Sequence, residues 1–118
     1  TFRTQIGERK MKGMFRTGWQ MDYPSIENFL APIFATGSSS NDGDYSNEKF
    51  DTLLDEAAAE TDAAASNAKY QEAEALLAAD MPSIPMWYGK TTMGWSEKVT
   101  GVKITAFGTI DFSSVSMK

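Results

Sequence analysis

The stretch Gly18-Trp19-Gln20-Met21-Asp22-Tyr23-Pro24 puts an indole three residues before a carboxylate and closes on a proline. Apolar residues alternate up to it, with Phe15, Trp19 and Met21 on one face, so a strand is expected over residues 14–21. A carboxylate beside an indole at a strand end can hold a cationic, partly apolar ligand, because the acid pairs with an ammonium and the ring attracts cations. The plainer interpretation is a core Trp and a helix-capping Asp, and this stretch alone favours it.

After Pro24 the apolar period changes to that of a helix. The spacing i, i+3, i+4, i+7 and i+8 predicts an amphipathic helix whose buried face consists of Ile26, Phe29, Leu30, Ile33 and Phe34. Ser25 is a candidate N-cap, and Pro32 should keep the helix short or break it. Residues 37–44 have the composition of a loop, without the alternate spacing and distal Glu of a calcium loop.

Two further helices are expected to form an antiparallel pair. The first is predicted from about Ser46, a candidate cap, to Glu60, and the second from Ala63 to Ala79 with Asp62 as its cap. Their apolar faces are predicted to meet. These faces consist of Phe50, Leu53, Leu54, Ala57 and Ala58 in the first helix, and Tyr70, Ala73, Leu76 and Leu77 in the second.

Beyond the second helix the chain should be extended, because Pro82 and Pro85 restrict themselves and their neighbours. Residues 86–88 are predicted to form a short aromatic strand that turns into another at 91–95. The remaining apolar positions indicate a glycine-interrupted β tail; they are Val99, Val102, Ile104 and Phe107.

Composition narrows the classes of function. The 118 residues suit one domain or a piece of one, and a net charge of −5 argues against nucleic acid as a partner. The chain has neither Cys nor His. This excludes disulfides, thiol nucleophiles, imidazole catalysis and zinc sites of the Cys/His type.

Several short motifs follow one another in a fixed order. They are Gly18-Trp19-x-x-Asp22-Tyr23-Pro24, Asn28-Phe29-Leu30, Tyr45-Ser46-Asn47-x-x-Phe50-Asp51-x-Leu53-Leu54, Tyr70-x-x-Ala73-Glu74-x-Leu76-Leu77, Asp80-x-Pro82-x-Ile84-Pro85-Met86 and Val99-x-Gly101-Val102. In order and spacing they resemble the carboxy-terminal part of the large oligopeptide- and dipeptide-binding proteins, solute-binding protein family 5, that feed ABC importers. The resemblance covers the chain from about Gly18 to its end.

The resemblance implies an α/β fold, or α+β as an isolated fragment, with helices packed on a small mixed sheet as a piece of a two-lobed clamp. Residues 1–100 would belong to the carboxy-terminal lobe, and residues 101–118 would be a tail that crosses back to the other lobe. The missing amino-terminal part of the same protein would carry a secretion signal and often a lipid-anchored Cys. We therefore expect an extracytoplasmic protein, either periplasmic or a cell-surface lipoprotein. The chain alone lacks one wall of the clamp, so we expect little ligand binding by it and self-association through exposed apolar surface.

The resemblance also implies a site and a function. In peptide-binding members the Asp of Gly-Trp-x-x-Asp, here Asp22, holds the α-ammonium of the ligand, and the flanking positions are Trp19, Gln20 and Met21. The implied function is to bind short peptides by their main chain and free amino terminus and to deliver them to permease subunits. No catalytic residue, cofactor or metal is implied. Family members often have a basic residue where this chain has Ser66, so we expect an ion pair to be missing there.

Two other functions stay open at this point. The same receptor could bind oligosaccharides or another small solute, with Trp19, Trp87, Tyr88 or Trp95 lining the cleft. Against this, Trp87 and Trp95 are interpreted as strand-core aromatics. A carboxylate-dependent hydrolase would need a pair such as Asp51 and Asp55 with one member desolvated, whereas an exposed helix face favours a solvated pair.

Overall fold

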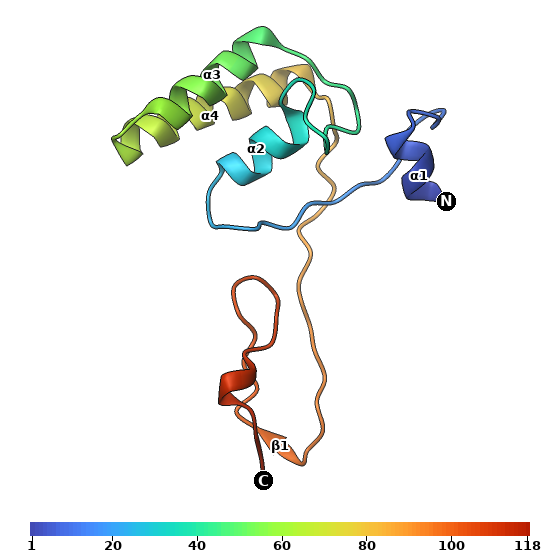
Figure 1. Ribbon diagram of the computed structural model, residues 1–118, viewed down its shortest axis with the longest axis vertical. Helices are drawn as coiled ribbons and strands as arrows, with labels where there is room; N and C mark the ends of the chain where they lie inside the picture. The colour runs from blue at the N-terminus through green and yellow to red at the C-terminus, as the bar shows by residue number, and fades with distance from the viewer. The chain divides into compact units, whose positions relative to one another are not determined.

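The computed structural model describes residues 1–118, which form two compact units, Thr1–Ile84 and Pro85–Lys118 (Figure 1). The first unit contains the four helices. These are α1 (Phe2–Gly7), α2 (Glu27–Phe34), α3 (Glu48–Ala59) and α4 (Ala63–Asp80). The second unit contains β1 (Val99–Thr100), the 3-10 turn η1 (Phe112–Ser114) and β2 (Ser116–Met117). The chain is therefore mixed in α and β content.

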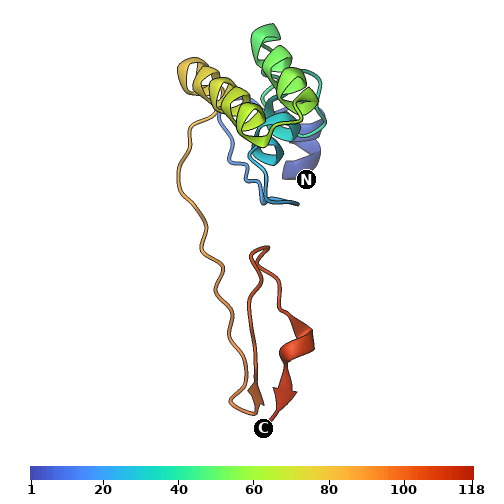
Figure 2. The same ribbon diagram turned by 90° about the vertical axis from the view of Figure 1, so that its left-hand side faces the viewer.

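Helices α3 and α4 run side by side as the predicted antiparallel pair (Figure 2). The Asp62 carboxylate accepts a hydrogen bond from the Ala65 amide at 2.8 Å, so the predicted cap of α4 is confirmed. Ser66 donates to the Ala57 carbonyl at 2.8 Å and supplies no charge. An ion pair nevertheless joins the two helices, at Lys69 instead of at residue 66. The Nζ atom of Lys69 lies 2.7 Å from a carboxylate oxygen of Glu56 and 3.5 Å from one of Glu60.

The cap of α3 differs from the prediction by one residue. Asn47, not Ser46, precedes the helix, and its side chain accepts from the amides of Lys49 at 3.0 Å and Phe50 at 3.2 Å. The hydroxyl of Ser46 instead accepts from Thr36 at 3.1 Å. Sequence could not separate the two because Ser and Asn are equally good caps.

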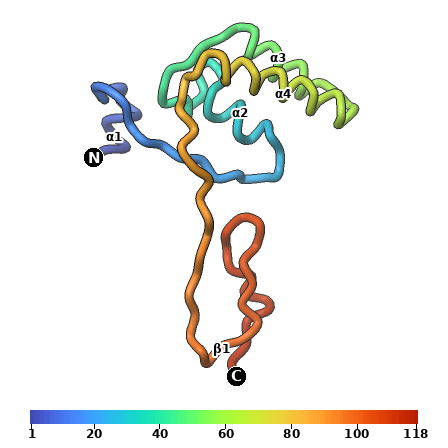
Figure 3. The backbone as a smooth tube through the Cα atoms, turned by 180° about the vertical axis from the view of Figure 1, so that it is seen from behind, coloured from blue at the N-terminus to red at the C-terminus, as the bar shows by residue number.

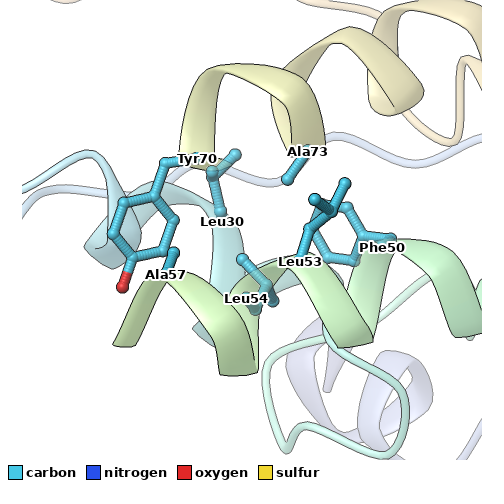
Figure 4. Close-up of a cluster of buried hydrophobic side chains, with 7 residues drawn as sticks. All are labelled: Leu30, Phe50, Leu53, Leu54, Ala57, Tyr70 and Ala73. Atoms are coloured by element: carbon cyan, nitrogen blue, oxygen red, sulfur yellow. The ribbon is translucent and has the colours of Figure 1, made fainter. Parts of the chain in front are cut away.

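The core of the first unit lies where α2, α3 and α4 meet (Figures 3 and 4). Its buried members are Leu30, Phe50, Leu53, Leu54, Ala57, Tyr70 and Ala73. All seven were predicted to lie on buried faces. Two other residues assigned to those faces, Phe29 and Ala58, are exposed, Phe29 by 41%. The buried arc of α2 is therefore displaced from the predicted one, and Asn28 lies inside it at 2% exposure.

Arg9 holds α1 to the loop of residues 37–44. Its Nε donates to Asp44 at 2.7 Å, and its Nη2 donates to the Asn41 carbonyl at 3.1 Å. The buried amide of Asn41 donates to the Tyr45 carbonyl at 2.7 Å and accepts from the Tyr45 amide at 3.0 Å. The predicted loop is confirmed, and its acidic end pairs with a guanidinium within the chain.

Three predicted strands are absent. Residues 14–21, 86–88 and 91–95 carry no strand assignment. A strand exists only when its N–H and C=O groups form a ladder with a neighbouring strand, and alternation of side chains does not supply that neighbour. Trp87 and Trp95 are 62% and 56% exposed, so their interpretation as strand-core aromatics is wrong for this chain.

The second unit contains a two-residue antiparallel ladder and an isolated antiparallel bridge between Ile104 and Ile110. Val99 pairs with Met117 and Thr100 pairs with Ser116, so the sheet has two antiparallel strands and is not the mixed sheet that was expected. Gly101 has φ +74°, and a Cβ there would come within 1.9 Å of the Ser114 carbonyl oxygen. The predicted glycine-interrupted β tail is thus confirmed in part.

Candidate functional site

The candidate site is the loop of residues 19–22, which is fastened to the first turn of α2 by one side-chain oxygen. Asn28 Oδ1 accepts a hydrogen bond from the indole Nε1 of Trp19 at 3.2 Å. The same oxygen accepts from the backbone amide of Asp22 at 2.9 Å. Two donors use both lone pairs of an amide oxygen, so this acceptor is saturated. The loop conformation therefore depends on a residue outside the loop.

A second contact holds the following residue. The phenol of Tyr23 donates to the Glu27 carboxylate, one residue before Asn28. This hydrogen bond is the main reason why the pKa of Tyr23 is raised, with an opposing contribution from its contact with Asn28. The first turn of α2 thus positions both ends of the Asp22-Tyr23 pair.

The start of α2 also tests the plainer interpretation of Asp22. The helix begins at Glu27 with Ile26 in the cap position, and the Ser25 hydroxyl accepts from the Glu27 amide at 3.2 Å. Ser25 therefore does the work predicted for it, although it lies one residue before the formal cap. Asp22 does not cap this helix, so its interpretation as a helix-capping residue is wrong.

The four predicted site residues are consecutive and largely accessible. Trp19 is 36% exposed, Gln20 and Asp22 are exposed, and Met21 is half-buried. A purely core Trp is therefore also wrong. The structure brings Trp19 and Asp22 together on Asn28, and the chain between them presents Gln20 and Met21.

Sequence reasoning missed Asn28. Asn28 belongs to the Asn-Phe-Leu motif and lies off the apolar stripe that the helical period defines. The one available signal was an amide between an acid and an aromatic residue in a helix directly after Gly-Trp-x-x-Asp. That pattern does not predict that the Asn28 side chain accepts hydrogen bonds from Trp19 and Asp22.

A separate open hollow of about 810 Å³ lies between α2, α3 and α4. Alanines and Leu54 form its apolar lining, and its acidic residues are Glu27, Asp51, Asp55 and Glu60. Neither Trp19 nor Asp22 lines it.

Asp51 accepts hydrogen bonds from the backbone amide of Thr36 at 3.0 Å and from the Thr36 hydroxyl at 2.5 Å. Its carboxylate therefore serves to join the start of the 36–46 segment to α3.

Comparison with known proteins gives three informative relatives. The peptide transport periplasmic protein SapA of Haemophilus influenzae is 30% identical over 102 residues, which are 84% of this chain and 18% of the relative. The probable deoxycholate-binding periplasmic protein YgiS of Escherichia coli is 36% identical over 73 residues, 62% of this chain and 14% of the relative. The oligopeptide-binding protein OppA of Bacillus subtilis is 27% identical over 103 residues, 87% of this chain and 19% of the relative. No family model matches the chain.

These similarities agree with the order of motifs quoted above: the chain belongs to the oligopeptide- and dipeptide-binding proteins, solute-binding protein family 5. It spans less than a fifth of the length of these curated relatives. Like the relatives named as periplasmic, it is extracytoplasmic. None of its helices is both long enough and apolar enough to cross a membrane.

Proposed function

We propose that this chain is the carboxy-terminal portion of a receptor that binds short peptides outside the cytoplasm and delivers them to the permease subunits of an ABC importer. Residues 1–100 would form part of one lobe of a two-lobed clamp. Residues 101–118 would cross back to the other lobe. The peptide would lie along the extended segment that ends at Met21, with its free amino terminus at Asp22.

One observation carries the proposal: the accessible indole of Trp19 and the backbone amide of the accessible Asp22 both donate to the same buried oxygen of α2. The carboxylate of Asp22 can pair with an ammonium, and Trp19 offers an apolar wall beside it. Residues 14–21 form neither helix nor strand, and a peptide main chain can bind to such a segment by strand addition. The names of the SapA and OppA relatives support a peptide as the ligand class.

A second candidate keeps the receptor and changes the solute. YgiS is named as probably deoxycholate-binding, so relatives of this chain include a protein named for a ligand without an amino terminus. An oligosaccharide or an apolar acid could lie against the exposed indole of Trp19 without using Asp22. Such a ligand predicts that replacing Asp22 leaves its binding unchanged.

Isothermal titration calorimetry on the full-length protein tests the peptide proposal. Asp22→Asn should weaken binding of short free-amino peptides by about 1.5–3 kcal/mol, the usual worth of a hydrogen bond to a charged group. N-acetylation of the peptide should cost the wild type a similar amount. The matched control is Asp55→Asn, an exposed acid on α3, which should bind as the wild type does. Equal affinity for free and acetylated peptides would contradict the role of Asp22, and binding of sugars or bile acids alone would favour the second candidate.

A further inference from the structure

We propose that Asn28 is the positioning residue of the ligand site, setting the mutual placement of the Asp22 carboxylate and the Trp19 ring. This inference rests on the proposed function and deepens it. The two donors meet at one atom, at 3.2 Å for the indole nitrogen and 2.9 Å for the backbone amide. Their separation therefore cannot exceed the sum of those distances, whatever the rest of the loop does.

The burial of Asn28 protects these two hydrogen bonds from water. Asn28 is 2% exposed, so water cannot replace either donor at Oδ1 without opening the packing of α2. Replacing the amide with an apolar side chain would leave the indole N–H and the Asp22 N–H without their acceptor. Because both groups lie near the surface, they would turn to water rather than stay in place. Asp22 would then lose the backbone contact that places it beside Trp19, although the charge of its carboxylate is unchanged.

The consequence for recognition is specific. A ligand whose ammonium meets Asp22 must also carry its first side chain past Trp19, since one oxygen fixes both. Loss of Asn28 should therefore reduce the preference for a free amino terminus more than it reduces contacts along the peptide main chain. A residue that only stabilises the fold would weaken both kinds of contact alike.

The chain contains a matched control. Asn41 is the other buried Asn, at 3% exposure, and its side-chain oxygen also accepts from a backbone amide, that of Tyr45 at 3.0 Å. Its amide nitrogen donates to the carbonyls of Ala35 and Tyr45, so its hydrogen bonds lie within the loop before α3 and not at residues 19–22. Asn41→Leu thus removes a buried amide of the same kind without touching the proposed site.

The test measures the ratio of affinities for a free-amino tripeptide and its N-acetylated form, in the full-length protein. Asn28→Leu should lower this ratio roughly tenfold, the effect of losing about 1.4 kcal/mol at the amino end. Asn41→Leu should lower the melting temperature and keep the ratio within about twofold. Asn28→Ser, whose shorter side chain cannot reach both donors, should act in the same direction if Asn28→Leu does not fold. Combining Asn28→Leu with Asp22→Asn should lower the ratio no further than Asp22→Asn alone, because both changes act on one contact.

Two results would overturn the inference while leaving the proposed function intact. One is an unchanged ratio in a folded Asn28 variant. The other is an equal fall of the ratio in the Asn28 and Asn41 variants. A wild-type protein that makes no distinction between free and acetylated peptides would instead refute the role of Asp22, and the inference with it.

Discussion

The phenol of Tyr45 donates a hydrogen bond to the carboxylate of Asp80 at 2.7 Å, and so joins the segment before α3 to the last residue of α4. Asn47 donates to the same oxygen at 2.8 Å. The ring of Tyr45 also packs edge-on against Phe34 and Phe50, with centroids 6.3 and 5.6 Å apart. The hydrogen bonds from Tyr45 and Asn47 lower the pKa of Asp80. Burial, followed by the bond to Asp80, raises the pKa of Tyr45 to about 12.

These shifts predict two pH limits for the stability of the helical unit. The ionised Asp80 stabilises the folded state fully at pH values above 3.8, its pKa in the unfolded chain. This stabilisation is lost as the pH falls through the lower pKa that Asp80 has in the folded state. The protonated Tyr45 stabilises the folded state fully at pH values below 10.0, its pKa in the unfolded chain. This stabilisation is lost as the pH rises from 10.0 toward the folded pKa of about 12. Asp80→Asn should therefore melt below the wild type near neutral pH, with a difference that closes in acid. Circular dichroism melts across the pH range measure this, and a difference that stays constant down to the acid limit would contradict it.

The capping assignment predicts a contrast between neighbouring residues. Asn47→Ala removes the acceptor for two amides of the first turn of α3 and should cost about 1 kcal/mol, within the 0.5–2 kcal/mol range of lost caps. Ser46→Ala removes only a 3.1 Å contact with the Thr36 hydroxyl, which keeps its 2.5 Å hydrogen bond to Asp51, and should cost less. Hydrogen exchange at the Lys49 and Phe50 amides separates the two. Faster exchange in the Ser46 variant than in the Asn47 variant would show that the cap is misassigned.

Met81 ends α4 in the left-handed conformation, with φ 49° and ψ 52°. An L side chain is strained there, whereas glycine is not, and the Met81 side chain is 54% exposed and has little packing to lose. Met81→Gly should therefore stabilise the helical unit by roughly 0.5–1 kcal/mol. Met81→Ala is the control, because it shortens the side chain and keeps the strain. A gain of the same size in the Ala variant would assign the effect to the side chain instead.

Residues 1–118 alone should self-associate and bind peptide weakly. The segment that follows α4 exposes several large apolar side chains, namely Ile84, Met86, Trp87 and Tyr88. Exposed apolar side chains of this kind favour association with another chain. Analytical ultracentrifugation at increasing concentration should show association, and calorimetry should show no micromolar peptide binding. A strictly monomeric chain that binds peptide at micromolar affinity would refute the need for a second lobe.

The helical part of the fold could be predicted from sequence because its determinants are local. Residues only a few positions apart define both the apolar period of α3, with Leu53, Leu54 and Ala57, and the cap of α4 at Asp62. The bounds of α4 were predicted to within one residue at its end, since Pro82 excludes a longer helix. Errors of the local kind were small, such as the choice of Ser46 over Asn47.

The strands and the site scaffold could not be predicted in the same way. A strand at 14–21 requires a partner backbone, which the alternation of side chains does not identify, and these residues carry no strand assignment. The inward turn of Asn28 depends on where the loop before α2 folds back, which no period within α2 encodes. Phe29 illustrates the same limit. It is apolar and falls on the predicted buried face of α2, yet it is 41% exposed, because the helices that pack against α2 determine which of its faces is buried.

The buried cluster of the helical unit contains none of residues 19–22. Apart from the two donors that Asn28 holds, this loop therefore contributes nothing to the packed cluster of α2, α3 and α4. On the proposed function, a change of cargo would require changes in this loop and none in the buried cluster.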